Sequence, residues 1–89
     1  MSTVFIAFQV NEDTRQIIAA IMEDNPAAVL NESPAMVKIN CEGRLVVKRD
    51  SIEARIGRSF NLQEMHLNLI TLTGYIDEDD DEFVLSWKH

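Results

Sequence analysis

The stretch NEDTRQIIAAIMEDNP, residues 11–26, decides the fold because it carries the clearest helical pattern in the chain. Its apolar positions recur every three or four residues, which places them on one stripe of a helix. The stripe consists of Thr14, Ile17, Ile18, Ile21 and Met22. Asn11 is predicted to be the N-cap, and two acids follow it in the first turn, where the helix dipole favours negative charge. Asn25 followed by Pro26 predicts the end of the helix.

The residues before this helix alternate in the way that predicts a strand. Val4, Ile6 and Phe8 lie on one face, and Phe5 and Ala7 lie on the other. The second face has a counterpart further along the chain in Met36 and Val46. Two interpretations stay open for these residues: a second buried face, or an exposed apolar patch used for docking.

After the helix the sequence predicts a short strand over residues 28–30, a turn at NESP, and then a hairpin around CEG. A three-residue loop with Gly43 in a left-handed conformation sets Val37 and Ile39 opposite Val47 and Leu45. A two-residue loop would set Ile39 opposite Val46 instead. We prefer the three-residue loop because it gives the cleaner apolar face, and it places Cys41 in the turn.

The second half of the chain repeats this order of elements. DSIE, residues 50–53, resembles a capping box, and Gly57 fits a C-cap, which together predict a helix of about two turns. EMHLNLITLTG, residues 64–74, is strand-like with a shift of apolar phase that a bulge near Leu69 would explain. FVLSW, residues 83–87, alternates as a strand does. The predicted fold is α+β: a small single domain of two β-α-β-β units with a mostly antiparallel sheet.

Composition limits the possible partners and the location of the protein. The chain has 89 residues, with 15 acids against 8 bases and a net charge of −7. Such a charge repels nucleic acid and anionic membrane surfaces, so neither is expected as a partner. No apolar run approaches the ~20 residues of a membrane span. With one cysteine and no secretory signal, a cytoplasmic location is expected.

Six consecutive acids, Asp77 to Glu82, stand between two apolar runs. An EF-hand loop starting at Asp77 would need glycine at its sixth position and glutamate at its twelfth, but the chain has Glu82 and Lys88 there. The run is interpreted as a solvated hairpin tip. Its charges are expected to speed association with a basic partner surface.

No catalytic, cofactor-binding or metal-binding residues are predicted. His66, His89 and Cys41 lie far apart in sequence and lack metal-ligand spacing. The glycines stand alone and form no phosphate loop, and no serine lies in a nucleophile motif. His66 is interpreted as a half-exposed strand residue. The residues by themselves therefore indicate a binding module and not an enzyme.

Three segments together resemble a known family: IMEDNPAAVL, PAMVKINCEGRLVVKRDSIEARIGRSFNLQEM and LITLTGYIDEDDDEFVLSWKH. They resemble the regulatory (effector) component of bacterial multicomponent phenol hydroxylases, which is related to the coupling proteins of toluene and soluble methane monooxygenases. The likeness runs from Phe5 to His89, so residues 1–89 are interpreted as one monooxygenase effector domain.

The resemblance implies a non-catalytic activator without a cofactor of its own. Such a component docks on a hydroxylase above the hydroxylase's di-iron centre and tunes substrate access, oxygen activation and electron coupling. The implied partner is thus the hydroxylase, with functional interplay with a reductase. The alternative is a stand-alone small-ligand-binding or adaptor domain without an oxygenase partner.

The partner-binding surface is expected on the second helix, its exit and the strand that follows. The polar candidates, expected to point outward, are Arg55, Arg58, Ser59, Asn61, Asn68 and Thr71. Phe60 is the seventh candidate, and the sequence fits it equally well to the core.

Overall fold

The computed structural model describes residues 3–87; residues 1–2 and 88–89, including His89, lie outside this description. The elements in chain order are β1 (Thr3–Gln9), α1 (Glu12–Asp24), β2 (Val29–Glu32), β3 (Met36–Glu42), β4 (Arg44–Lys48), α2 (Arg49–Ile56), the 3₁₀ helix η1 (Leu62–Asn68), β5 (Leu69–Thr73), β6 (Tyr75–Glu78) and β7 (Glu82–Ser86).

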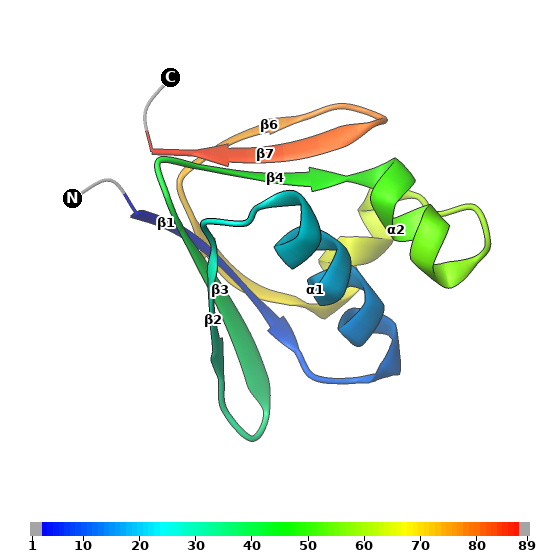
Figure 1. Ribbon diagram of the computed structural model, residues 1–89, viewed down its shortest axis with the longest axis horizontal. Coiled ribbons are helices and arrows are strands. Elements are labelled where there is room, and N and C mark those ends of the chain that lie inside the picture. The colour runs from blue at the N-terminus through cyan, green and yellow to red at the C-terminus, as the bar shows by residue number, and fades with distance from the viewer. Residues whose placement is uncertain (1–2, 88–89) are drawn as a thin grey trace.

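The strands form two antiparallel sheets. Sheet A has the order β2-β3-β1-β5, and sheet B has the order β4-β7-β6. The helix α1 lies in the angle between the two sheets (Figure 1). The predicted α+β class with a mostly antiparallel sheet is confirmed, while β6 and η1 are elements that the sequence pattern did not reveal.

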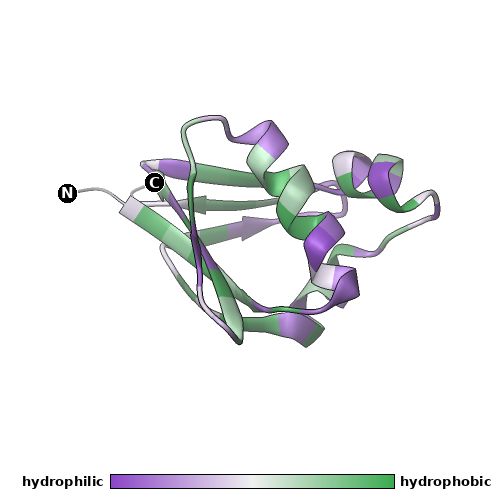
Figure 2. Ribbon diagram, turned by 60° about the horizontal axis from the view of Figure 1, so that its bottom comes forward, coloured by the Kyte–Doolittle hydropathy of each residue, from purple (hydrophilic) through white to green (hydrophobic). Residues whose placement is uncertain are grey.

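The core fills the space between α1 and the inner faces of both sheets. The middle turns of α1 are hydrophobic and its two ends hydrophilic (Figure 2). The largest fully buried side chains of the core include Phe8, Phe83, Ile6, Ile21 and Ile39. Every residue of the predicted helical stripe is buried except Met22, which is half-buried against the same core.

The start of α1 is confirmed as predicted. Thr14 N–H donates to Asn11 Oδ1 at 2.9 Å, and Asn11 N–H donates to Thr14 Oγ1 at 2.9 Å, so the two residues cap each other. The buried Thr14 hydroxyl also donates to the Gln9 carbonyl at 2.6 Å. This bond fixes the turn between β1 and α1.

The hairpin predicted around CEG is wrong for both loop lengths. β3 pairs with β1 and β2 in sheet A, whereas β4 pairs with β7 in sheet B. The apolar set itself is correct: Val37, Ile39, Leu45 and Val47 are all buried. Two strands with apolar inner faces can bury them either as neighbours in one sheet or across a core from two sheets, and only the second occurs here. Cys41 accordingly lies buried in β3 and not in a turn.

Each passage from sheet A to sheet B is made by one glycine. Gly43 (φ 80°) separates β3 from β4, and Gly74 (φ 134°) separates β5 from β6. Both have the positive φ that residues with a Cβ adopt only at a cost. Both lie beside the end of β7, since Trp87 N–H donates to the Gly43 carbonyl at 2.9 Å and a Cβ at Gly74 would lie 3.2 Å from the Ser86 carbonyl oxygen.

Asn25, at the C-terminus of α1, closes the open edge of sheet B. Its Nδ2 donates to the Val46 carbonyl at 2.7 Å, and its Oδ1 accepts from Val46 N–H at 3.0 Å. Nδ2 also donates to the Ile21 carbonyl at 2.7 Å, within its own helix. An edge strand leaves every second N–H and C=O pair without a strand partner. The amide of Asn25 takes the place of that partner and ties the helix to β4.

Two other predictions, one at the start of α2 and one at β2, need correction. The helix begins at Arg49 after an N-cap, Lys48, without a side-chain cap bond, so the expected capping box at Asp50 is wrong. The backbone explains the difference, because Arg49 N–H donates to the Asp81 carbonyl at 2.9 Å and is thereby satisfied. The strand expected over residues 28–30 runs instead from Val29 to Glu32, because Ala28 closes a turn on Asn25.

The segment expected as a long strand is divided between η1 and β5. η1 has a capping box, in which Asn61 Oδ1 accepts from Gln63 N–H at 2.9 Å and Glu64 Oε2 accepts from Asn61 N–H at 3.1 Å. Leu62 and Met65, three residues apart, are its buried side chains, which suits a 3₁₀ helix. The predicted bulge is confirmed: β5 shifts register against β1 between Thr71 and Leu69.

Replacing Asn25 with alanine should lower the free energy of unfolding by about 2–4 kcal/mol, because it leaves the backbone N–H and C=O of Val46 without their hydrogen-bond partners. Backbone strain does not confuse the result, since Asn25 has a negative φ of −128°. Ser33→Ala is the control, because Ser33 makes one exposed hydrogen bond to the Met36 carbonyl. Its expected cost is about 0.5–1 kcal/mol. Equal losses in urea denaturation would contradict the role given to Asn25.

Gly43 and Gly74, at the two passages from sheet A to sheet B, should differ in their tolerance of a side chain. A Cβ at Gly74 would lie 2.9 Å from Val4 Cγ1, whereas one at Gly43 meets nothing within 4 Å. Gly43→Ala should therefore cost only the backbone strain, about 1 kcal/mol. Gly74→Ala should cost about 3 kcal/mol or more, because Val4 is fully buried and has little room to move. Thermal and urea melts of the pair test this order.

Candidate functional site

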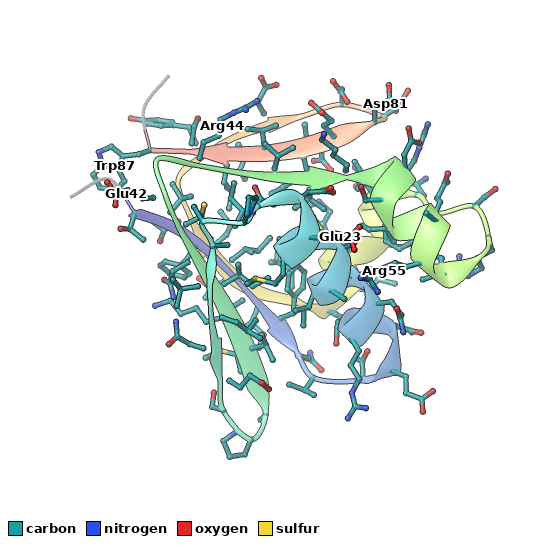
Figure 3. All side chains as sticks on the ribbon, viewed as in Figure 1. Glu23, Glu42, Arg44, Arg55, Asp81 and Trp87 are labelled. Carbon is teal, nitrogen blue, oxygen red and sulfur yellow. The ribbon has the colours of Figure 1, made fainter. Side chains whose placement is uncertain are left out.

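The structure disperses the seven predicted partner-binding residues over three places. Arg55 faces α1, where its Nη2 lies 2.9 Å from Glu23 Oε2, and the two side chains point toward each other (Figure 3). Thr71 lies exposed on β5, opposite Ala7. The other five lie at the exit of α2 and along η1.

Three of these five meet around one hollow. Arg58, Phe60 and Asn68 line a cavity of about 140 Å³ together with residues from the first two turns of α1. Asn68 Oδ1 accepts from Asn11 Nδ2 at 2.8 Å, which joins η1 to the N-cap of α1. The guanidinium of Arg58 donates to the Ser59 carbonyl at 2.9 Å and lies 3.7 Å from Glu64.

Phe60 belongs to the core, with 6% of its surface exposed. Its backbone N–H donates to Glu53 Oε2 at 2.7 Å. Glu53 also lies 3.9 Å from Arg49 Nε, so one carboxylate connects α2 with the loop that leaves it. Ser59 and Asn61, on either side of Phe60, are exposed. Phe60 is thus an anchor that presents its polar neighbours to solvent.

The acidic run forms the tip of the β6–β7 hairpin, but it is more than a solvated turn. Arg49 Nη2 lies 2.8 Å from Asp81 Oδ1, in addition to the backbone bond between the same residues. Asp81 marks the tip in Figure 3, at the end of sheet B that meets α2. The tip, α2 and residues 59–64 line an open surface hollow of about 580 Å³.

Asp79 gives the tip its shape. Its Oδ1 accepts the backbone N–H groups of Glu82 and Asp81, at 2.8 Å each. These two bonds stabilise the ionised form and hold the pKa of the Asp79 carboxyl below its usual value of 3.8.

His66 lies in η1 and not in a strand, although it is half-buried as expected. Its Nε2 is 3.3 Å from Glu78 Oε2, and its ring meets Phe83 edge-on with centroids 5.7 Å apart. These contacts attach η1 to sheet B. Burial raises the pKa of the Cys41 thiol above its usual value of 9.0, which disfavours the reactive thiolate.

Sheet A has an outer side that faces away from α1. By the strand register, its two central rows are Val29, Asn40, Phe5 and Thr73, and Asn31, Lys38, Ala7 and Thr71. We call these eight residues the outer face of sheet A. Phe5 is half-buried and Ala7 buried, the latter between the longer side chains of Lys38 and Thr71.

Between residues 3 and 87, no three His, Cys, Asp or Glu side chains lie close enough to hold a metal ion together. The same part of the chain contains no helix long and apolar enough to cross a membrane. A hollow of about 330 Å³ on sheet B is open, and acids such as Asp77, Asp79 and Glu82 line it. Small-molecule pockets are usually enclosed and apolar, so this hollow is a poor candidate for one.

Comparison with known proteins gives a consistent result. The family model described as MmoB/DmpM matches residues 2–86. The chain is 48% identical over 88 residues to the phenol 2-monooxygenase stimulatory component DmpM of Pseudomonas sp. (strain CF600), covering 99% of this chain and 98% of that protein.

Solved structures give the same picture. One chain in a structure of a phenol hydroxylase–regulatory protein complex matches with a TM-score of 0.93 and 48% identity, over 97% of this chain and 99% of that one. Regulatory protein B of soluble methane monooxygenase matches with a TM-score of 0.77 at 18% identity, over 97% of this chain and 65% of that one. The second match shows a shared fold.

The low pKa of Asp79 predicts a specific dependence of stability on pH. Because the folded-state pKa lies below the unfolded value, the carboxylate stabilises the fold above about pH 4, and this contribution is lost as the pH falls through the folded-state pKa. Wild type should therefore be more stable than Asp79→Ala at pH 7, and the difference should shrink toward pH 3. Asp80→Ala, which changes an exposed residue of the same tip, should give no such trend. Urea denaturation at several pH values measures both.

Proposed function

The chain belongs to the MmoB/DmpM family, and we propose that it is the regulatory component of a multicomponent phenol or aromatic monooxygenase. The observation that carries this proposal is the 48% identity to a stimulatory component over practically the whole of both chains. The match to a chain of equal length in a phenol hydroxylase–regulatory protein complex names the partner, a hydroxylase. Nothing observed favours the alternative of a stand-alone ligand-binding or adaptor domain.

The proposed component is not itself an enzyme and has no cofactor. The di-iron centre that supplies oxygen chemistry belongs to the hydroxylase, and a reductase supplies electrons to it. Residues 1–89 act as one effector domain, in the cytoplasm.

An activator of this kind acts through differential binding. If it binds one conformation of the hydroxylase more tightly than another, it shifts the population toward that conformation. The shift cannot exceed the difference between the two binding free energies. A rigid activator loses little of that difference to its own ordering, and Glu53 and Asn68 hold the proposed docking segment in place before binding.

We propose that the exit of α2 and η1 contact the hydroxylase, through Arg58, Ser59, Asn61 and Asn68, with Arg55 and Thr71 at the margins. Phe60 supports this surface from the core and is not a contact. The hollow formed by Arg58, Phe60 and Asn68 would receive a side chain of the partner. Arg58, Ser59 and Asn61 are exposed, and Asn68 is half-buried.

Reconstitution tests the function. Purified protein is titrated into a phenol hydroxylase with its reductase, and product formation and NADH consumption are both measured. We expect saturable activation and a higher ratio of product to NADH consumed. An unchanged rate and ratio at saturating protein would refute the regulatory role.

Charge reversal tests the docking surface in the same assay. Arg58→Glu should raise the concentration needed for half-maximal activation about tenfold, equivalent to about 1.4 kcal/mol, and leave the circular dichroism spectrum unchanged. Arg15→Glu makes the same change of charge on an exposed position of α1 and serves as the control. Equal effects of the two variants would show that net charge, and not this surface, governs docking.

A further inference from the structure

Arg49 lies where the tip of the β6–β7 hairpin meets the start of α2. Its backbone N–H donates to the Asp81 carbonyl at 2.9 Å, one residue beyond Lys48 and Glu82, the last pair of the β4–β7 ladder. Its Nη2 also lies 2.8 Å from Asp81 Oδ1. The tip is therefore fastened to α2 twice, once through the backbone and once through charge (Figure 1).

The same guanidinium group is also attracted by Glu53, one helical turn further along α2. Arg49 Nε lies 3.9 Å from Glu53 Oε2, which is too far for a hydrogen bond. Nε is closed off from solvent and has no hydrogen-bond partner among the described residues. A buried N–H without a partner costs free energy, so the guanidinium group stays on Asp81 against the attraction of Glu53.

Glu53 in turn fixes the segment that leaves α2. The same oxygen, Oε2, accepts the backbone N–H of Phe60 at 2.7 Å. Residues 59–61 belong to no helix or strand, so no regular ladder of backbone bonds holds them in position. One carboxylate oxygen therefore stands between the cation of Arg49 and the backbone of the proposed docking segment.

These contacts form a chain from Asp81 through Arg49 and Glu53 to Phe60. Without the carboxylate of Asp81, the guanidinium group would turn to the next carboxylate, where its Nε gains a partner. Asp50 Oδ1 is 4.0 Å from Nε, but the Asp50 side chain is 88% exposed and that of Glu53 only 31%. Water screens an exposed charge more strongly than a partly buried one, so Glu53 attracts the group more strongly. The shift would draw Glu53 Oε2 away from Phe60 N–H.

From this chain of contacts, and resting on the proposed function, we propose that Asp81 and Arg49 are positioning residues for docking to the hydroxylase. Asp81 holds Arg49 away from Glu53. Glu53 is thereby left to fix residues 59–61 in the geometry that binds. The acidic tip thus acts inside the protein through one of its residues, in addition to the attraction of its charges to a basic surface.

The tip and the docking segment also lie beside each other on the surface. Asp80, Arg49, Glu53 and residues 59–61 all line the open hollow of about 580 Å³. A hydroxylase that covers the docking segment would therefore come close to the tip as well. A change in the tip can weaken docking in two ways, by removing charge from this surface or by breaking the link to Glu53.

Matched alanine substitutions separate these two effects. Asp81→Ala removes the side-chain contact with Arg49 and keeps the backbone bond. Asp80→Ala removes the same charge from an exposed neighbour whose side chain has no hydrogen bond or ion pair within the described part of the chain. Titration calorimetry with a hydroxylase should show a Kd raised about threefold to fivefold by Asp81→Ala and changed less than about 1.5-fold by Asp80→Ala. The rate of phenol hydroxylation at saturation should stay unchanged in both.

Hydrogen exchange in the free protein reads the internal link without the hydroxylase. In Asp81→Ala the amide of Phe60 should exchange several-fold faster than in wild type, because Glu53 no longer holds it. The amide of Ile6, in the central strand β1, should exchange as in wild type. A general loss of stability would instead speed the exchange of both amides.

Glu53→Gln provides a background in which the link is already broken. Glutamine keeps an acceptor for Phe60 N–H but does not attract the guanidinium group by charge. In this background Asp81→Ala should change the Kd less than about 1.5-fold, and the exchange of the Phe60 amide should no longer respond to it. Circular dichroism and urea denaturation verify the folding of each variant.

The possible outcomes separate this inference from the function on which it rests. If wild type activates the hydroxylase but Asp80→Ala weakens binding as much as Asp81→Ala, surface charge governs docking and only this inference fails. It fails as well if Asp81→Ala has the same effect with and without Glu53, or if it speeds exchange at Phe60 and leaves the Kd unchanged. If wild type neither binds nor activates, both the proposed function and this inference fail.

Discussion

The bonds between the Asn25 amide and the backbone of Val46 are the constraint on which the arrangement of the two sheets depends. The chain passes from sheet A to sheet B through single glycines and returns from β4 to β5 through α2 and η1, and these connections leave the angle between the sheets to the packing. The helix α1 follows directly from sheet A, and its last residues reach the free edge of sheet B. Asn25 therefore connects, through 2.7–3.0 Å bonds, the element that belongs to one sheet with the backbone of the other. Ile17, Ile18 and Ile21 of the same helix are buried in the core between the two sheets.

Local patterns in the sequence predicted most of the elements, and pairing between distant strands is what they could not predict. α1, its N-cap Asn11 and the bulge in β5 are each defined by residues close in sequence, and all three were correct. The CEG hairpin failed because alternation shows which side chains are buried and not which strand lies beside them. η1 was missed although its signal, an Asn61–Glu64 capping box, was present. The apolar residues of η1 were read together with those of β5 as one alternating strand, so the change from helical to strand spacing was not recognised.

The candidate surface was predictable in part, for a related reason. Exposed polar residues after α2 could be selected from the sequence, but the bond between Arg55 and Glu23 and the burial of Phe60 depend on packing against α1 and η1. The outer face of sheet A was visible in the sequence only as an unresolved choice between core and patch. The register decides it, because it places Phe5 and Lys38 on the side of sheet A that faces away from α1.

The order of strands in the sheets also governs when this protein can fold during its synthesis. β1 is the first strand made, and it waits for β5, some 60 residues later, before both of its edges are paired. β4 likewise waits for β7, the last strand that the structure describes. Until then the inner faces of both sheets remain incomplete on the ribosome, with apolar side chains such as Phe8 and Leu45 unburied. The sheets can therefore close only after β7 has been made, and the contacts that close them join residues far apart in sequence, which is the kind of contact that slows folding.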